Sequence, residues 1–294
     1  MTNNTKGLCL ALFAMLGGGV FAVPYRLSLE KADSMTVVWG IFIWALFFSI
    51  PGAWITREKM RYSLKIGLVT IATALAGLIG NYSACQALSE NSPTLFNLVS
   101  RSEIIIAIIL SWIFLKEWII FRVWIAIILI ITGIIVMKFD SLNFELNEWS
   151  ATLWALLTAF SFAVMLVLAK SIIHEIDPQV LNVFRLLLAL IVLWSFKEVR
   201  IGVANLQMTE WKLLAFAAFS GPFLGRIAYT YSLRYLTISN SVIICSFSPV
   251  ITLLLELLVF GTIISLLEAL GGLIVLGGIV WVFIPRNSHN RNLI

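Results

Sequence analysis

Five charged side chains interrupt otherwise apolar stretches of this sequence, and their types could do chemistry. They are Arg101, Glu103, Arg185, Arg226 and Glu256. A charge at the centre of a membrane-spanning helix costs about 2.5–3.5 kcal/mol on insertion scales, so such residues indicate functional sites. A guanidinium can hold a carboxylate through two parallel hydrogen bonds, and a deep carboxyl group can carry a proton or hold an ammonium group. The alternative for each charge is a structural ion pair with a neighbouring helix.

Arg101 and Glu103 belong to one apolar run, Pro93–Leu115. Arg101 lies about nine residues from its start, roughly 14 Å deep at about 1.5 Å per residue, close to the membrane midplane. Glu103 follows two residues later, about 200° further round a regular helix, so the two side chains are expected to face different directions. Ser100 and Glu103 share a small, polar stripe, which predicts that Glu103 faces the helix bundle.

Asn81 and Arg226 occupy equivalent positions when the two halves of the chain are aligned at a shift of 145 residues. Sites in transporters built from inverted repeats lie near the midplane between the repeats, so both residues are predicted to line a cavity. Their neighbourhoods also contain Tyr82 and Tyr229, which could stack on a substrate or simply pack.

Arg185 and Glu256 are predicted to be less central. Arg185 lies towards one end of its run, where its side chain can reach the interface or pair structurally. Glu256 lies about one helical turn from the end of its run, and it either binds a proton or faces an outer vestibule. Pro222 and Pro249 lie inside runs and remove backbone donors there, which predicts kinks that line a cavity or serve packing alone.

The sequence offers little for catalysis or metal binding. Cys9, Cys85 and Cys245 are scattered among apolar runs, and neither His174 nor His289 lies in one. These residues cannot build a disulfide framework, a zinc site or a catalytic triad, and no Gly-x4-Gly-Lys-Ser/Thr motif for nucleotides occurs. We therefore expect no enzyme activity, no metal and no cofactor. The basic residues lie mostly in short loops, a pattern of membrane orientation rather than of nucleic-acid binding.

The elements that must position the charges are long apolar runs. Of the 294 residues, 61% are hydrophobic and only 12% are charged, whereas soluble domains carry about 25% charged residues. Runs near 20 residues are long enough to cross about 30 Å of hydrocarbon. Ten can be drawn: Gly7–Val23, Met35–Ile55, Leu64–Ala87, Pro93–Leu115, Phe121–Met137, Trp149–Lys170, Val180–Phe196, Trp211–Leu233, Ser239–Phe260 and Ile263–Ile284.

The loops and the repeat together predict a topology. With the amino terminus inside, 11 Lys and Arg residues fall on the cytoplasmic side and six on the other, so both termini are expected to be cytoplasmic. Segment 114–133 aligns with segment 259–278, again at a shift of 145. Because five spans per half is odd, the second repeat must be inverted. We expect an all-α integral membrane protein of ten transmembrane helices, with repeats at 1–140 and 149–285 and a cytoplasmic tail at 286–294.

Several short motifs carry a family resemblance. They are Tyr82–Leu88, Tyr231–Leu236, Leu115–Glu117, Ser246–Pro249 and Gly271–Gly278. On these residues the chain resembles the ten-span, EamA-like branch of the drug/metabolite transporter superfamily, along nearly its whole length. The resemblance implies export or uptake of small metabolites, commonly amino acids. The sequence departs from the family pattern at Gly261-Thr262, where such repeats usually end in Gly-Glu. Thr262 aligns with Glu117 of the first half, so Glu117 lacks an acidic counterpart.

These observations predict a secondary transporter that moves an amino acid or related carboxylate-bearing compound across the cell inner membrane by alternating access. Three intramembrane arginines against two glutamates favour such a substrate. The expected partners of the protein are its small-molecule substrate and the lipid bilayer, and nucleic acid is not expected. The sequence leaves open whether the protein forms a homodimer. The open alternatives are a lipid or lipid-carrier flippase and a non-transporting membrane assembly subunit. The candidate substrate-binding residues are Asn81, Tyr82, Arg101, Glu103, Arg226 and Tyr229, and the candidates for proton coupling are Glu103 and Glu256.

Overall fold

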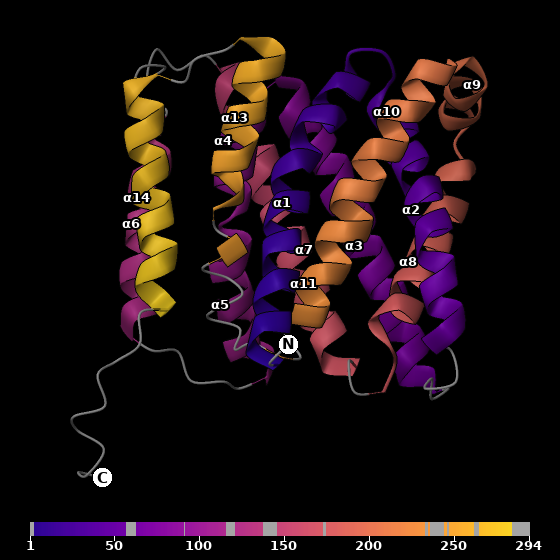
Figure 1. Ribbon diagram of the computed structural model, residues 1–294, viewed down its shortest axis with the longest axis horizontal. Helices are drawn as coiled ribbons and strands as arrows, with labels where there is room; N and C mark the ends of the chain where they lie inside the picture. Colours follow the sequence, from indigo (N-terminus) through magenta and orange to yellow (C-terminus); the bar gives the residue numbers. More distant parts are fainter. Residues whose placement is uncertain are drawn as a thin grey trace.

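The computed structural model describes residues 3–56, 63–90, 92–115, 121–137, 146–172, 175–232, 235, 244–245, 247–261 and 265–283. These residues are almost all helical and contain no strand, and the helices run side by side in one bundle (Figure 1). The predicted tail at 286–294 and Glu117 lie outside the described residues.

The helices follow the apolar runs of the sequence. The first half contains α1 (Asn3–Leu29), α2 (Ser34–Thr56), α3 (Leu64–Glu90), α4 (Pro93–Ser100), α5 (Glu103–Leu115) and α6 (Phe121–Met137). The second half contains α7 (Leu146–Ile172), α8 (Pro178–Trp194), α9 (Lys197–Asn205), α10 (Met208–Ala218), the π-helical η3 (Phe219–Gly225), α11 (Arg226–Ser232), α13 (Ser248–Phe260) and α14 (Leu266–Phe283).

Helix starts follow the local sequence. Ser92 precedes Pro93 and accepts a hydrogen bond from the Leu95 amide at 3.2 Å, so it caps α4. Asp177 precedes Pro178 and accepts from the Gln179 amide at 3.0 Å at the start of α8. Proline suits the first helical position because its missing N–H would have no partner there.

Six described helical stretches are long and apolar enough to cross a membrane, and the number becomes seven if the bent pair α8–α9 counts as one span. The six lie in α1, α2, α3, α4–α5, α7 and α10–α11. Lys197–Glu210 reads as a loop in the sequence, but its first part forms α9, which turns by 98° from α8. Val199 of this helix is fully buried against its neighbours, although four of the nine residues of α9 are charged or polar.

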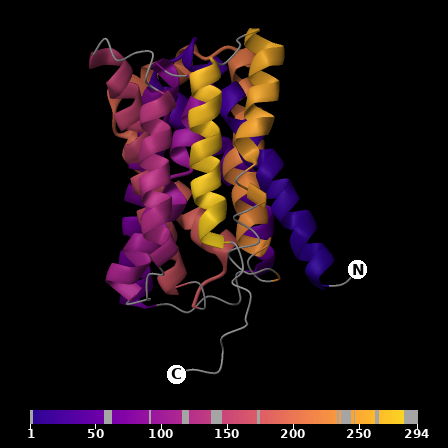
Figure 2. The ribbon, with the colours of Figure 1, turned by 90° about the vertical axis from the view of Figure 1, so that its left-hand side faces the viewer.

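The helices pair between the two halves of the chain. Helix α6 packs along α14, α2 along α8, and α4 against α13. Helix α1 packs on α10, η3 and α11, as α3 packs on α7. Each pair joins a first-half helix to a second-half helix, and exchanging the halves reproduces the pattern, as expected of two structural repeats. Both views show α14 beside α6 at one end of the bundle (Figures 1 and 2).

Two long helices are interrupted. Between α4 and α5 the Arg101 amide bonds to the Leu98 carbonyl at 3.2 Å, and the Ser102 amide bonds to the Val99 carbonyl at 3.1 Å, so the chain tightens locally.

The second interruption is η3, which contains Pro222. The Ser220 hydroxyl donates to the Phe216 carbonyl at 3.0 Å and to the Ala217 carbonyl at 3.2 Å, and so supplies a donor beside the proline that has none. The structure therefore has a π-helical segment at Pro222, where the sequence predicts a kink. Pro249 instead lies in the first turn of α13, where a missing N–H costs little.

Candidate functional site

A cavity of about 210 Å³ lies where both interrupted helices face α1, α3 and α8. It is smaller than the roughly 300–1,000 Å³ of pockets for drug-sized ligands. Five of the six predicted substrate-binding residues line it: Asn81, Arg101, Glu103, Arg226 and Tyr229. Its apolar walls include four phenylalanine rings, those of Phe21, Phe42, Phe96 and Phe162. The structure thus brings together side chains that are up to 148 residues apart in the chain.

Arg101 is held by Asn97, one helical turn before it. The Asn97 Oδ1 atom accepts from Arg101 Nε at 3.2 Å and from Nη2 at 2.9 Å. The Asn97 Nδ2 atom donates to the Thr252 hydroxyl at 2.6 Å and to the Gly18 carbonyl at 3.3 Å. Asn97 is only 2% exposed, so a fully bonded amide fixes this guanidinium to α1 and α13.

Arg101 and Glu103 both line this cavity, although a regular helix would point their side chains in nearly opposite directions. The physical reason is the break between α4 and α5. Residues two positions apart, such as Arg101 and Glu103, are related by a rotation of about 200° around the axis of an α-helix but about 240° around that of a 3₁₀-helix. The angle between their side chains, seen down the axis, therefore narrows from about 160° to about 120°. The prediction that Glu103 faces the bundle, with Ser100, is confirmed.

Arg226 is the first residue after the π-helical segment. Its Cζ atom lies 5.0 Å from the centre of the Phe162 ring, a cation–π distance. A Cβ atom on Gly80 would lie 2.7 Å from that ring, so glycine in α3 gives Phe162 its place. The ring in turn sets the position of the guanidinium in the cavity wall.

Arg185 lines the cavity too, and the sequence interpretation missed it by placing it nearer the interface. Its Nη2 atom donates to Asn182 Oδ1 at 2.6 Å, and its Nη1 atom contacts Met165 Sδ at 3.1 Å. Asn182 is itself fixed by donating to the Ser49 hydroxyl at 3.0 Å. A sequence signal existed, because Arg185, like Arg101, follows an asparagine by about one helical turn.

Asn81 and Tyr229 contribute the remaining predicted polar groups of the cavity. Asn81 donates from Nδ2 to the Gly77 carbonyl at 2.7 Å within its own helix. Its backbone carbonyl accepts from the Tyr25 hydroxyl at 3.0 Å, which joins α3 to α1. Tyr229 packs beside Ala14 and Cys245.

Two predicted residues lie away from the cavity lining. Tyr82 accepts a hydrogen bond from Gln86 at 2.8 Å, and its ring meets Trp154 edge-on with centres 6.2 Å apart. Glu256 is 2% exposed and accepts from the Thr94 amide at 2.8 Å. It thereby satisfies a free N–H at the start of α4, where a negative charge is favourable.

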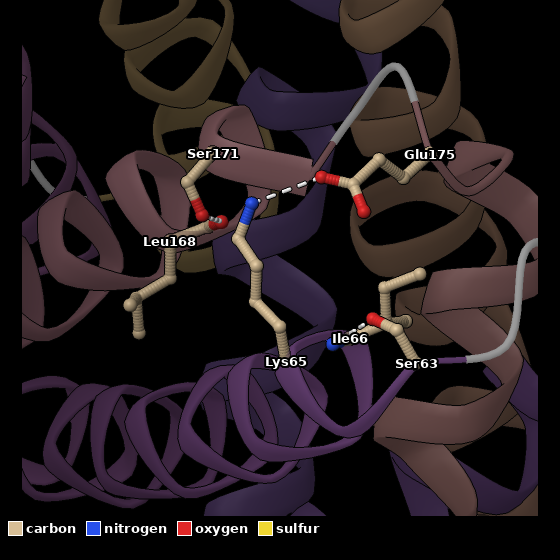
Figure 3. Close-up of polar contacts among 6 residues, drawn as sticks. All are labelled: Ser63, Lys65, Ile66, Leu168, Ser171 and Glu175. Atoms are coloured by element: carbon tan, nitrogen blue, oxygen red, sulfur yellow. Dashed lines mark hydrogen bonds and ion pairs between the residues drawn. The ribbon is translucent and has the colours of Figure 1, made fainter.

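In the described part of the chain, the charged groups of the cavity form no direct salt bridge with one another. Over the described ranges, the only ion pair at 4.0 Å or less joins Lys65 to Glu175. That pair lies between the start of α3 and the residues after α7, and its side chains are 60% and 34% exposed (Figure 3). Three guanidiniums and one carboxyl group therefore surround the cavity without a direct salt bridge in the described part of the chain.

Comparisons with known proteins agree with this architecture. A crystal structure matches 95% of this chain and 97% of its own with a TM-score of 0.65, and at 15% identity this likeness shows the fold alone. A probable transport protein of Saccharomyces cerevisiae is 43% identical over 63 residues, which are 21% of this chain and 18% of the yeast protein. The model of the EamA-like transporter family matches twice, at residues 5–139 and 149–284. Because the two matches together span nearly the whole chain, this protein belongs to the EamA-like transporter family.

Proposed function

We propose that this protein is a secondary transporter of a small metabolite that carries a carboxylate, such as an amino acid. The observation that carries the proposal is the charge of the cavity. Arg101, Arg185 and Arg226 face it, whereas Glu103 is the one carboxyl group among its described lining residues. A substrate carboxylate would supply the missing negative charge.

The energetic argument follows from the low polarity of the surroundings. Arg185 and Arg226 both contact the sulfur of Met165, so their guanidiniums lie close together. Two like charges about 7 Å apart repel by roughly 2–3 kcal/mol at an effective dielectric constant of about 20. A bound anion removes this repulsion and forms charge-assisted hydrogen bonds, which are about twice as strong as neutral ones.

Glu103 adds a carboxyl group to a site whose other charged residues, among those described, are arginines. It lies within electrostatic range of Arg226 and Arg101, and it could hold a substrate ammonium group beside the bound carboxylate, or a proton. Phenylalanine rings form much of the remaining wall and suit an apolar side chain. An amino acid combines these three features within a small volume.

The proposal includes a membrane arrangement. The shorter apolar helices α6, α8, α13 and α14 would complete ten spans together with the six long stretches. The repeats at 1–140 and 149–285 would be inverted, with both termini cytoplasmic in the inner membrane. Alternating access would rock these halves around the cavity, with the interrupted helices as its natural hinges.

The test is counterflow of radiolabelled compounds into proteoliposomes, first with pooled amino acids and then with pooled anionic metabolites. Arg226→Ala removes the charge, Arg226→Lys keeps the charge but not the planar fork, and Arg200→Ala is the control because Arg200 is exposed on α9. We expect accumulation with the wild type and Arg200→Ala, loss with Arg226→Ala and impairment with Arg226→Lys.

Two outcomes would contradict the proposal. Undiminished transport by folded Arg226→Ala would remove Arg226 from the site. Absence of counterflow from both pools, together with movement of labelled lipid between leaflets, would favour the flippase alternative.

A further inference from the structure

Two guanidiniums of the cavity converge on one sulfur atom. Arg185 Nη1 lies 3.1 Å from Met165 Sδ, and Arg226 Nη1 lies 3.9 Å from the same atom. Met165 is 4% exposed and comes from α7, whereas the arginines come from α8 and α11. A thioether is a weak hydrogen-bond acceptor and carries no charge. The position between the two cations is therefore occupied by a group poorly matched to them.

The arginines hold this arrangement through other contacts. Arg185 is anchored by Asn182 at 2.6 Å, and Arg226 lies over the Phe162 ring at 5.0 Å. A Cβ atom on Gly77 would lie 2.7 Å from Arg185 Nη1 and 3.2 Å from Met165 Sδ, so α3 packs directly against Arg185 and Met165. The two guanidiniums are thus set in place before any ligand binds, which lowers the entropic cost of binding an anion.

Met165 also lines a second cavity, which shares part of its wall with the central one. A smaller cavity of about 80 Å³ extends from the central one towards the start of α8, and Met165 lines it. Arg185, Arg226, Leu166 and Thr230 line both cavities and form their shared wall. A carboxylate between the arginines would sit at this boundary, in reach from either side.

We infer that Arg185 and Arg226 form a two-arginine clamp for the substrate carboxylate, and that the Met165 sulfur marks the position which that carboxylate takes. Met165 has three flexible side-chain bonds, so it can swing away as the anion binds. The inference rests on the proposed function and deepens it, because it adds Arg185 and Met165 to the binding step. It also predicts that the empty and loaded states differ in the Met165 rotamer.

The test places a carboxylate permanently in the clamp. Met165→Glu and Met165→Gln have similar size and differ in charge, and both are compared with and without Arg185→Gln in a double-mutant cycle. We expect the thermal midpoint of Met165→Glu to exceed that of Met165→Gln by at least about 3 °C. The gain should shrink in the Arg185→Gln background. Counterflow by Met165→Glu should fall at least tenfold below that of Met165→Gln, because the built-in carboxylate excludes the substrate.

The outcomes separate this inference from the proposed function. A midpoint of Met165→Glu no higher than that of Met165→Gln overturns the clamp, even where Arg226→Ala still abolishes transport. Substrate affinity of Met165→Glu equal to that of the wild type overturns it as well. If the wild type moves no carboxylate, the proposed function fails, while a gain by Met165→Glu that depends on Arg185 still supports an anion site between the two arginines.

Discussion

Replacing Gly77 by alanine should damage substrate binding without unfolding the protein. Gly77 lies in α3, behind the guanidinium of Arg185 rather than in the cavity lining. The new Cβ atom would lie 2.7 Å from Arg185 Nη1, whereas ordinary contacts begin near 3.4 Å. The guanidinium must therefore withdraw by about 0.7 Å, and because Asn182 holds its other side, the clamp geometry changes.

The magnitudes of the two effects differ. A misplacement near 1 Å in a binding constellation can cost about 100-fold, so we expect the substrate half-saturation constant to rise about 10- to 100-fold. Alanine in a helix gains about 1 kcal/mol over glycine, and overpacking costs about 1–3 kcal/mol. The first term partly offsets the second, so the free energy of unfolding should fall by at most about 2 kcal/mol.

The assay is counterflow over a range of substrate concentrations, paired with thermal unfolding of the same preparation. Gly67→Ala is the matched control, since Gly67 lies in the same helix and no atom lies within 4 Å of its added Cβ atom. It should leave half-saturation unchanged. Wild-type half-saturation in Gly77→Ala would refute the reasoning, because it would mean that the Arg185 position does not govern binding.

Two further predictions concern packing and the carboxyl groups. Gly17→Ala should abolish stable folding, because its Cβ atom would lie 2.8 Å from Gly225 Cα and neither backbone can withdraw; Gly277→Ala, with open space around it, should purify normally. A monodisperse Gly17→Ala in size-exclusion chromatography would contradict this. Glu256→Gln should lower stability by about 1–2 kcal/mol at the start of α4 yet keep the half-saturation constant, whereas Glu103→Gln should change half-saturation with little effect on the thermal midpoint. If transport and thermal-unfolding assays instead showed that Glu256→Gln changes half-saturation and Glu103→Gln lowers stability, the roles assigned to the two glutamates would be wrong.

Much of the architecture could be predicted from hydropathy and repetition. Runs of apolar residues determine where α1, α2 and α3 lie, because buried or lipid-facing backbone must satisfy its own hydrogen bonds. The shift that aligns Asn81 with Arg226 correctly brought both to one cavity. The sequence does not predict helix α9, because four of its nine residues are charged or polar and the burial of Val199 against neighbouring helices leaves no signal in the sequence.

The finer site geometry depends on features without a sequence signal. The break after Ser100 contains neither proline nor glycine, so the sequence predicts a regular helix through Arg101 and Glu103. The contact of Arg185 with Met165 depends on how α7, α8 and α3 pack, which no spacing within one helix reveals.

The most direct test of the account is ligand-induced thermal stabilisation of the purified protein, with each free amino acid compared with its primary amide. The two compounds differ only in the carboxylate that the arginines are proposed to bind. A ligand at about 100 times its dissociation constant stabilises by about 2.7 kcal/mol, which raises the thermal midpoint by several degrees. We predict that at least one acid raises the midpoint and that its amide does not. Equal stabilisation by an acid and its amide would contradict a carboxylate site between the arginines.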